Sequence, residues 1–227
     1  MKRLIGREPR IRTDLDLPML KLGEWRVFTG LLRPGGIVYS LGVGEDIEFD
    51  RALIEHYRME IYAFDPTPNS VDWLSRRALP PGFHFHPWAV ADRDGVLYLF
   101  PRRKRDGSLS STMFTLVEDC EGRTDGVEVP ARTLDTIVRE LGHIRIDVLK
   151  MDIEGAEYGV LEGLLASTLR PSQLLVEFHH RHAGLDPSQT VATVANLREA
   201  GYALADISST GREFTFLFRP DLGNVSP

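Results

Sequence analysis

Lysine, carboxylate and histidine side chains follow two apolar runs in the second half of the sequence. The first run, IDVLKMDIEG, contains Lys150 and Asp152 near its end, and the second, LLVEFHH, contains Glu177 and His179. Residues two apart on a strand share a face, so Lys150 and Asp152 should influence each other's charge. A carboxylate or imidazole there can take a proton from a hydroxyl group. Asp152 is therefore our first candidate for positioning an acceptor or acting as a general base, with Lys150 and His179 beside it.

Two other interpretations of these residues stay open. Carboxylate and imidazole donors together suit Zn²⁺, Mn²⁺ or Fe²⁺, so Asp152, Glu177 and His179 are the candidates for a metal site. Histidines at a strand end are, however, more often surface residues than ligands, and Asp152 with Lys150 could form a structural ion pair. We therefore predict that no metal ion is bound.

A glycine-containing turn is the second group with chemical potential. In VYSLGVGEDIEFD an apolar run breaks at Gly42 and Gly44 and a helical pattern follows. Glycine permits positive φ and lets a ligand approach the backbone closely. A dinucleotide fingerprint would need a third glycine where Ile47 stands, and the Gly-Lys-Ser/Thr of a phosphate loop is absent. The acids directly after the glycines would repel a pyrophosphate, but they suit a ligand with an ammonium or sulfonium group.

The next apolar run, IYAFDPTP, ends with Asp65. A carboxylate at that place can accept hydrogen bonds from both hydroxyls of a ribose. S-adenosylmethionine carries a ribose, an ammonium and a sulfonium, so it satisfies both the turn and Asp65. An ordinary tight turn with a solvated acid is the alternative.

Short apolar runs that alternate with amphipathic stretches must position these residues. This alternation predicts β-α-β units and a parallel sheet. In the first amphipathic stretch Phe49, Leu53 and Tyr57 recur at helical spacing, which gives one buried face. Two runs, VLYLFP and VEVPARTL, interrupt the alternation and predict two strands around a polar loop. The closing runs YALADISS and REFTFLFRP are too close for a parallel crossover and predict an antiparallel pair.

Length and charge limit the domain organisation and the partners. The 227 residues are 42% hydrophobic, which suits one core. We predict an N-terminal arm over residues 1–35, packing on a domain over residues 36–227. The 33 acidic residues outnumber the 27 basic ones, for a net charge of -6, so neither nucleic acid nor an anionic membrane is an expected partner. One cysteine and no long apolar segment favour a cytoplasmic protein, and the pattern does not indicate an oligomeric state.

Five segments in this order resemble the FkbM-type methyltransferases, a branch of the class I S-adenosylmethionine-dependent enzymes: VYSLGVGEDIEFD, AFDPTP, AVADRDG, RTLDTI and KMDIEGAEYGVLEG. KMDIEGAE is the most specific of them, and the resemblance extends from about Gly36 to about Arg219. It implies a Rossmann-like α/β fold with a seven-stranded, mostly parallel sheet, an antiparallel last strand and a β-hairpin-like insertion between strands 3 and 4. It also implies S-adenosylmethionine-dependent methyl transfer, most often to a hydroxyl oxygen of a small-molecule or sugar-like acceptor.

The resemblance also implies positions for the cofactor. It places Gly42, Gly44 and Glu45 at the methionine part and Asp65 on the ribose. One departure matters, because many class I enzymes have an acid at the end of the first strand, where this chain has Ser40. Either Glu45 or its neighbour Asp46 then contacts the ammonium, or the cofactor binds less tightly.

Three further residues are placed by the same resemblance. Ala89 and Val90 are expected near the adenine, and Ser111 lies in the stretch 110–112, where related sequences have hydroxyl groups facing the site. A flexible loop after the run RRKRDG is the alternative for Ser111.

Two other functions stay open. A nucleoside-binding scaffold that has lost catalysis would keep the fold, and Ser40 is its main support. An NAD-type oxidoreductase would use a similar sheet, but the missing third glycine speaks against it.

Overall fold

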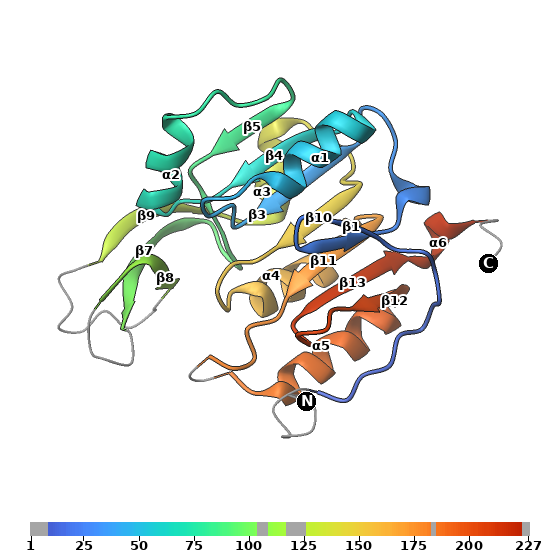
Figure 1. Cartoon of the computed structure of the whole chain (residues 1–227). Coiled ribbons are helices and arrows are strands. Elements are labelled where there is room, and N and C mark those ends of the chain that lie inside the picture. The colour runs from blue at the N-terminus through green and yellow to red at the C-terminus, as the bar shows by residue number, and fades with distance from the viewer. Residues whose placement is uncertain (1–8, 104–108, 117–125, 183–184, 224–227) are drawn as a thin grey trace.

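A seven-stranded sheet forms the centre of the computed structural model, which describes residues 9–103, 109–116, 126–182 and 185–223 (Figure 1). Across the sheet lie β12, β13, β11, β10, β3, β4 and β5. All pairs are parallel except those made by β13, which is antiparallel to β11 and β12. This confirms the predicted Rossmann-like sheet with an antiparallel last strand. The strands are β3 (Ile37–Leu41), β4 (Glu60–Phe64), β5 (Phe83–His86), β10 (Val148–Met151), β11 (Gln173–Glu177), β12 (Tyr202–Ile207) and β13 (Glu213–Phe218).

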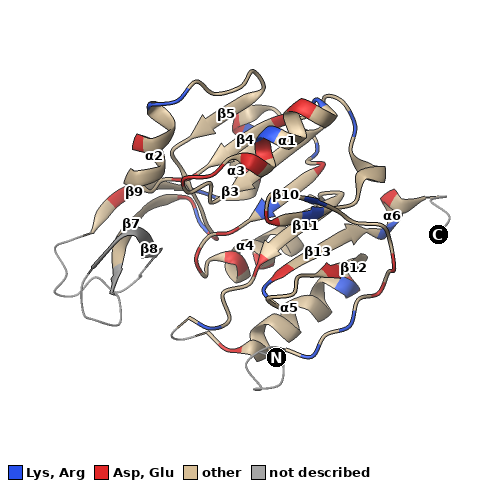
Figure 2. Ribbon diagram, viewed as in Figure 1, with Lys and Arg blue, Asp and Glu red and all other residues tan. Residues whose placement is uncertain are grey.

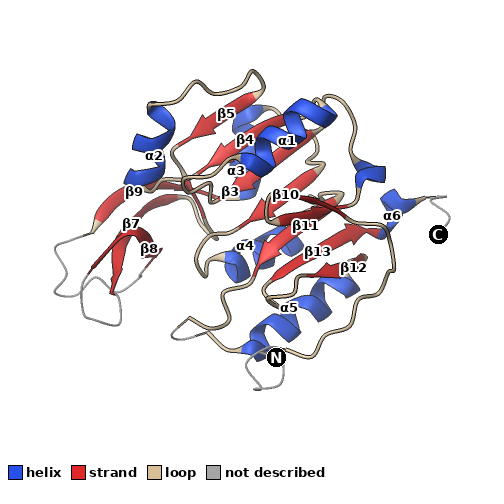
Figure 3. Cartoon of the chain, in the orientation of Figure 1, coloured by secondary structure: helices blue, strands red, loops and turns tan. Residues whose placement is uncertain are grey.

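Helices cover both faces of this sheet (Figure 3). On one face pack α1 (Glu48–Tyr57) and α2 (Pro68–Ser75), and on the other pack α3 (Leu134–Leu141), α4 (Glu157–Ala166) and α5 (Pro187–Glu199). Phe49 and Leu53 of α1 are buried and Tyr57 packs against them in part, which confirms the predicted apolar face. Alternation along the strands turns Val148 of β10 towards α1.

The insertion between β5 and β10 is larger than predicted. It forms a four-stranded sheet in the order β6, β9, β7, β8. Its strands are β6 (Ala89–Val90), β7 (Gly95–Arg103), β8 (Leu109–Leu116) and β9 (Val127–Arg132). The predicted pair of strands, β7 and β9, is antiparallel, and β7 and β8 form a further antiparallel pair. Strand β8 lies in the stretch expected to be a polar loop.

The N-terminal residues from 9 onwards run along the β12 side of the sheet and then cross it (Figure 1). The amide of Asp14 donates to the carbonyl of Leu204, and the amide of Phe28 donates to the side chain of Gln173 in β11. The segment contains the antiparallel pair β1 (Leu20–Leu22) and β2 (Trp25–Val27) and a short 3₁₀ turn (Thr29–Leu31), and the described chain ends with α6 (Arg219–Leu222). This packing places β2 next to the functional site described below.

Candidate active site

A cavity of about 250 Å³ opens at the carboxyl ends of β3, β4 and β10. It lies beside the first turn of α1, whose acidic residues are red in Figure 2. Ligands bind open α/β sheets at this edge. The following residues predicted from the sequence line it: Gly42, Gly44, Asp65, Ala89, Val90, Lys150 and Asp152. Lining residues that the sequence analysis did not assign to the site include Trp25 of the N-terminal segment, Asp50, Thr67, Ser70 and Trp88.

The glycine turn after β3 needs its glycines for two different reasons. Gly42 has φ +75°, and a Cβ atom there would lie 1.7 Å from the carbonyl oxygen of Asp152. The turn and the end of β10 are therefore in direct backbone contact. Gly44 has φ +61°, and a Cβ atom there would meet nothing within 4 Å. Its backbone consequently borders open space on the cavity side.

Asp65 holds this turn in place. Its Oδ2 accepts hydrogen bonds from the amides of Val43 and Gly44 at 3.0 and 2.8 Å and from the Ser70 hydroxyl at 2.8 Å. Its Oδ1 accepts from the amide and the hydroxyl of Thr67 at 2.9 and 2.7 Å. A carboxylate offers about four acceptor sites, so five donors fill Asp65. The residue predicted to bind ribose thus already shapes the turn.

Two buried side chains of opposite charge, Asp50 and Lys150, lie under the turn. Ser40 is fully buried in β3, opposite Lys150 of β10, and is not among the lining residues. Asp50 of α1 is only 2% exposed but lines the cavity, and its Oδ1 accepts no hydrogen bond from the described residues. Lys150 donates to the carbonyl of Gly42 at 2.5 Å, with its Nζ 5.4 Å from the ring centre of Trp25. Burial raises the pKa of Asp50, and the charge of Lys150 opposes that rise. The helix α1 thus brings a buried carboxylate to the cavity wall.

The predicted cofactor contact Glu45 lies away from the cavity wall, and the prediction for Ser111 is not tested. Glu45 is exposed and is not among the lining residues, whereas its neighbour Asp46 lines the cavity. Asp46 accepts a hydrogen bond from the amide of Glu48 at 2.8 Å, so it also fixes the start of α1. The backbone of Ser111 lies in β8, and its side chain lies outside what the structure describes. Asp50 was missed, although an acid between Phe49 and Leu53 on a buried helical face is a signal in the sequence.

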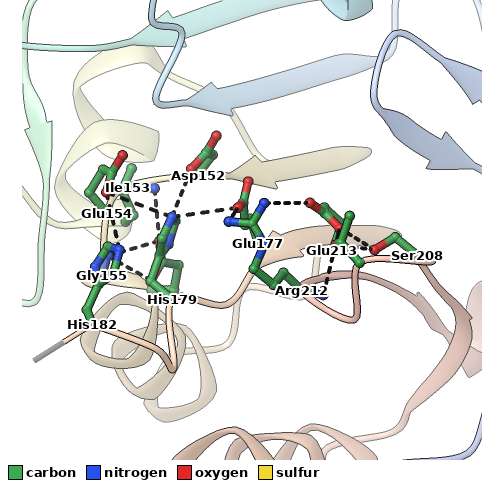
Figure 4. A network of polar contacts seen from close by, with 12 residues as sticks. Asp152, Ile153, Glu154, Gly155, Glu177, His179, His182, Ser208, Arg212 and Glu213 are labelled. Carbon is green, nitrogen blue, oxygen red and sulfur yellow. Dashed lines mark hydrogen bonds and ion pairs between the residues drawn. The ribbon is translucent and has the colours of Figure 1, made fainter. Parts of the chain in front are cut away.

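Carboxylates surround the ring of His179, which follows β11 (Figure 4). Its Nδ1 lies 2.8 Å from Oε1 of Glu157. Its Nε2 lies 3.6 Å from Asp152, 3.8 Å from Glu177 and 3.9 Å from Glu154. His179 is 5% exposed, and Asp152 belongs both to this cluster and to the cavity wall. The predicted meeting of the two strand ends is therefore present.

Glu157, at the start of α4, orients this cluster. Its side chain is fully buried and accepts hydrogen bonds from the amides of Ile153 at 2.9 Å and Gly155 at 3.1 Å. Glu154 between them has φ +54°, a conformation that few non-glycine residues adopt. Glu157 thus fixes both the loop after β10 and the ring of His179.

The charges in this cluster shift one another's titration. Burial raises the pKa of Asp152, while neighbouring positive charges oppose the rise. Burial and the charge of Asp152 raise the pKa of Glu177 to about 7, although the guanidinium of Arg212 lies 2.6 Å away. Burial alone would lower the pKa of His179, but its hydrogen bond with Glu157 and the surrounding carboxylates raise it to about 9. The cluster therefore holds groups that can exchange a proton near neutral pH.

The fold is that of the class I S-adenosylmethionine-dependent methyltransferases. It is defined by the order of the strands, the antiparallel last strand and the glycine turn over a cavity at the carboxyl edge of the sheet. The family follows from the sequence, since the family model described as "Methyltransferase FkbM domain" matches residues 43–204. The chain belongs to this family, and its cofactor is S-adenosylmethionine.

Several named proteins are similar to the chain. The human "Probable methyltransferase-like protein 24" is 28% identical over 159 residues, which are 69% of this chain and 36% of that protein. The "2-O-methyltransferase NoeI" of Sinorhizobium fredii (strain NBRC 101917 / NGR234) is 25% identical over 174 residues, which are 70% of this chain and 72% of that protein. Among solved structures, the fibrillarin pre-rRNA processing protein of Methanococcus jannaschii has a TM-score of 0.46 and 12% identity, covering 93% of this chain and 86% of that one. The chain thus spans about a third of the length of the human relative. Within the described residues, no helix has the length and apolar character needed to cross a membrane.

Proposed function

We propose that this protein transfers the methyl group of S-adenosylmethionine to a hydroxyl oxygen of a small-molecule or sugar-like acceptor. One observation carries the proposal: Asp152 lines the cavity and also belongs to the cluster around His179. A proton-accepting group therefore borders the space next to the cofactor. The name of the relative NoeI, a 2-O-methyltransferase, supports oxygen as the acceptor atom.

The cavity has features that fit the cofactor. The open backbone of Gly44 leaves room for the methionine part of the cofactor. The buried Oδ1 of Asp50, which accepts no hydrogen bond from the described residues, is available to the ammonium group of the cofactor. We assign Asp65 to the ribose, and its carboxylate also holds the glycine turn through the amide of Gly44. Ala89 and Val90 line the cavity beside Trp88, and we assign them to the adenine. Asp50 replaces Ser40 and Glu45 in this assignment.

The residues of the chain then have three tasks in the reaction. The sulfonium of the cofactor supplies an activated methyl group, so alignment of the acceptor and exclusion of water are the main requirements. Asp152 holds the acceptor hydroxyl and takes its proton as the new C–O bond forms and the C–S bond breaks. Lys150 keeps the turn in contact with β10 through the carbonyl of Gly42. His179 lies 3.6 Å behind Asp152 and stabilises its charge.

The presence of Asp50 bears on the alternative of an inactive scaffold. That alternative rested on Ser40, the missing acid of the first strand. Because Asp50 brings a carboxylate to the cavity from α1, the absence of an acid at Ser40 no longer argues against a complete cofactor site.

A turnover assay with labelled cofactor tests the proposal. We expect the purified protein to form S-adenosylhomocysteine in the presence of a pool of hydroxylated small molecules and sugars. Asp152→Asn should bind S-adenosylhomocysteine as the native protein does and lose at least about 100-fold in turnover. Asp72→Asn, on the exposed side of α2, is the matched control and should keep full activity. Cofactor binding without turnover on any hydroxylated or amine acceptor would support the scaffold instead.

A further inference from the structure

We infer that Glu154, His179 and His182 bind one divalent metal ion beside Asp152, at the acceptor side of the cavity, and we call these four residues the histidine cluster. This inference differs from the prediction, made from the sequence, that no metal is bound. The catalytic role of the ion rests on the proposed function. The argument depends on three features: the separation of the donor atoms, the orientation of His179, and the chemistry of the donor set.

The donor atoms are spaced as ligands around an ion. The side-chain donors of Glu154, His179 and His182 all lie within 4.8 Å of one another. Nε2 of His182 lies 3.6 Å from Glu154, and Nε2 of His179 lies 3.6 Å from Asp152 and 3.9 Å from Glu154. These separations exceed hydrogen-bond length. They suit donors that each lie about 2.0–2.2 Å from a shared ion, because opposite ligands are then about 4 Å apart.

His179 is oriented as a metal-binding histidine. Its Nδ1 is bonded to the buried Glu157, whose own position is fixed by the amide of Gly155. A carboxylate on one ring nitrogen sets the tautomer and leaves the other nitrogen free for a metal. Within the described part of the chain, Nε2 of His179 makes no hydrogen bond, although the side chain is 95% buried. This ring nitrogen of a buried side chain thus points between carboxylates that all lie beyond hydrogen-bond distance.

Glu177 is excluded from the proposed ligands. Its carboxylate forms an ion pair with Arg212 at 2.6 Å, and Arg212 also reaches Glu213 at 3.6 Å. A cation at Glu177 would have to displace or face this guanidinium. The ion therefore belongs on the opposite side of His179, towards Glu154 and His182 (Figure 4).

The donor set selects the kind of ion. Two imidazoles with one carboxylate suit Mn²⁺, Fe²⁺ or Zn²⁺, whereas Mg²⁺ and Ca²⁺ prefer oxygen donors alone. Because Asp152 borders the cavity, an ion bound there can hold the acceptor hydroxyl and lower its pKa. Asp152, beside the ion, would stay free to take the proton of the acceptor. Acceptors with two neighbouring hydroxyls would then be favoured, since both can bind one ion.

Calorimetric titration of the metal-stripped, untagged full chain tests this inference. We expect Mn²⁺ and Zn²⁺ each to bind once per chain in the absence of cofactor, and Mg²⁺ to bind more weakly. His182→Gln and Glu154→Gln should each weaken Mn²⁺ binding about tenfold or more. Both residues are on the rim of the cluster, so these variants should fold more readily than a change at the buried His179. His84→Gln, at an exposed histidine of β5, is the control and should bind Mn²⁺ as the native chain does.

Two outcomes would overturn the metal site. One is no binding of Mn²⁺ or Zn²⁺ at millimolar concentration by a chain that binds S-adenosylhomocysteine. The other is binding that neither rim variant weakens, which would locate the ion elsewhere. Failure to bind S-adenosylhomocysteine in the same preparation would instead count against the proposed function, so the two failures are distinguishable.

Discussion

Asp65, directly after β4, accepts a hydrogen bond from the backbone amide of Gly44 at 2.8 Å. The end of β4 therefore holds the glycine turn that follows β3. The turn is thus formed before any ligand arrives. Its shape depends on a side chain 21 residues further along the chain.

Replacement of Asp65 should therefore affect the free protein as well as cofactor binding. Asp65→Ala removes an acceptor from five hydrogen bonds and should lower the free energy of unfolding without cofactor by about 3 kcal/mol. Urea denaturation of the cofactor-free protein measures this. Asp72→Ala, an exposed aspartate of α2, should change the value by less than about 0.5 kcal/mol. Unchanged stability together with lost cofactor affinity would mean that Asp65 acts on the ligand alone.

Asp50 is expected to govern recognition of the ammonium group. Asp50→Asn keeps the shape of the side chain and removes its charge, and affinity for S-adenosylhomocysteine should fall by about tenfold or more, since a charged hydrogen bond contributes about 1.5–3 kcal/mol. Glu45→Gln removes a charge from the exposed part of the same loop and should leave the affinity nearly unchanged. Isothermal titration compares the two. If Glu45→Gln lowers the affinity more than Asp50→Asn does, the ammonium group contacts Glu45 and not Asp50.

The contact between Gly42 and β10 can be tested with a pair of glycine variants. Gly42 and Gly35 have similar φ angles, +75° and +71°, but a Cβ atom at Gly35 would meet nothing within 4 Å. Gly35→Ala should lose about 1–2 kcal/mol of stability through its backbone conformation alone. Gly42→Ala adds the clash with the carbonyl of Asp152 and should lose at least about 2 kcal/mol more, with loss of cofactor binding. Thermal unfolding that is equal in both variants would contradict the close approach.

Stability in acid should depend on Asp94, in the loop before β7. The hydrogen bond from the hydroxyl of Thr136 at 2.6 Å, and then that from the amide of Thr133 at 2.7 Å, lower the pKa of Asp94 below its ordinary value of 3.8. A carboxyl with a lowered pKa stabilises the fold above its ordinary pKa, and this contribution is lost as the pH falls through the lower value.

Asp94→Asn should therefore be less stable than the native protein at pH 7, and the difference should shrink as the pH falls below about 4. Asp92→Asn, in the same loop and at the surface beside Arg93, serves as the control and should differ little from the native protein at either pH. Urea denaturation at a series of pH values provides the comparison. A difference for Asp94→Asn that stays constant down to pH 3 would show that ionisation of this carboxyl does not stabilise the start of α3.

The sequence was sufficient for the features that depend on local order. Hydrophobic periodicity predicted α1 with Phe49 and Leu53 inwards, and the short link between the last two runs required an antiparallel pair. The glycines marked the turn because few other residues adopt positive φ. Strand β8 was missed because its polar, hydroxyl-rich sequence lacks the alternation of a half-buried strand.

Only the tertiary structure decided which polar groups meet. Lys150 and Asp50 are 100 residues apart in the sequence and both line one cavity, and Glu157 bonds to His179 across 22 residues. Hydrogen bonds and ion pairs depend on distances of a few ångströms, and those distances follow from how helices pack on the sheet. The sequence therefore determined the fold class and the edge of the sheet where the site lies. The packing of α1 brings the carboxylate of Asp50 to the cavity, where the chain has no acid at Ser40. The packing of α4 lets Glu157 orient His179.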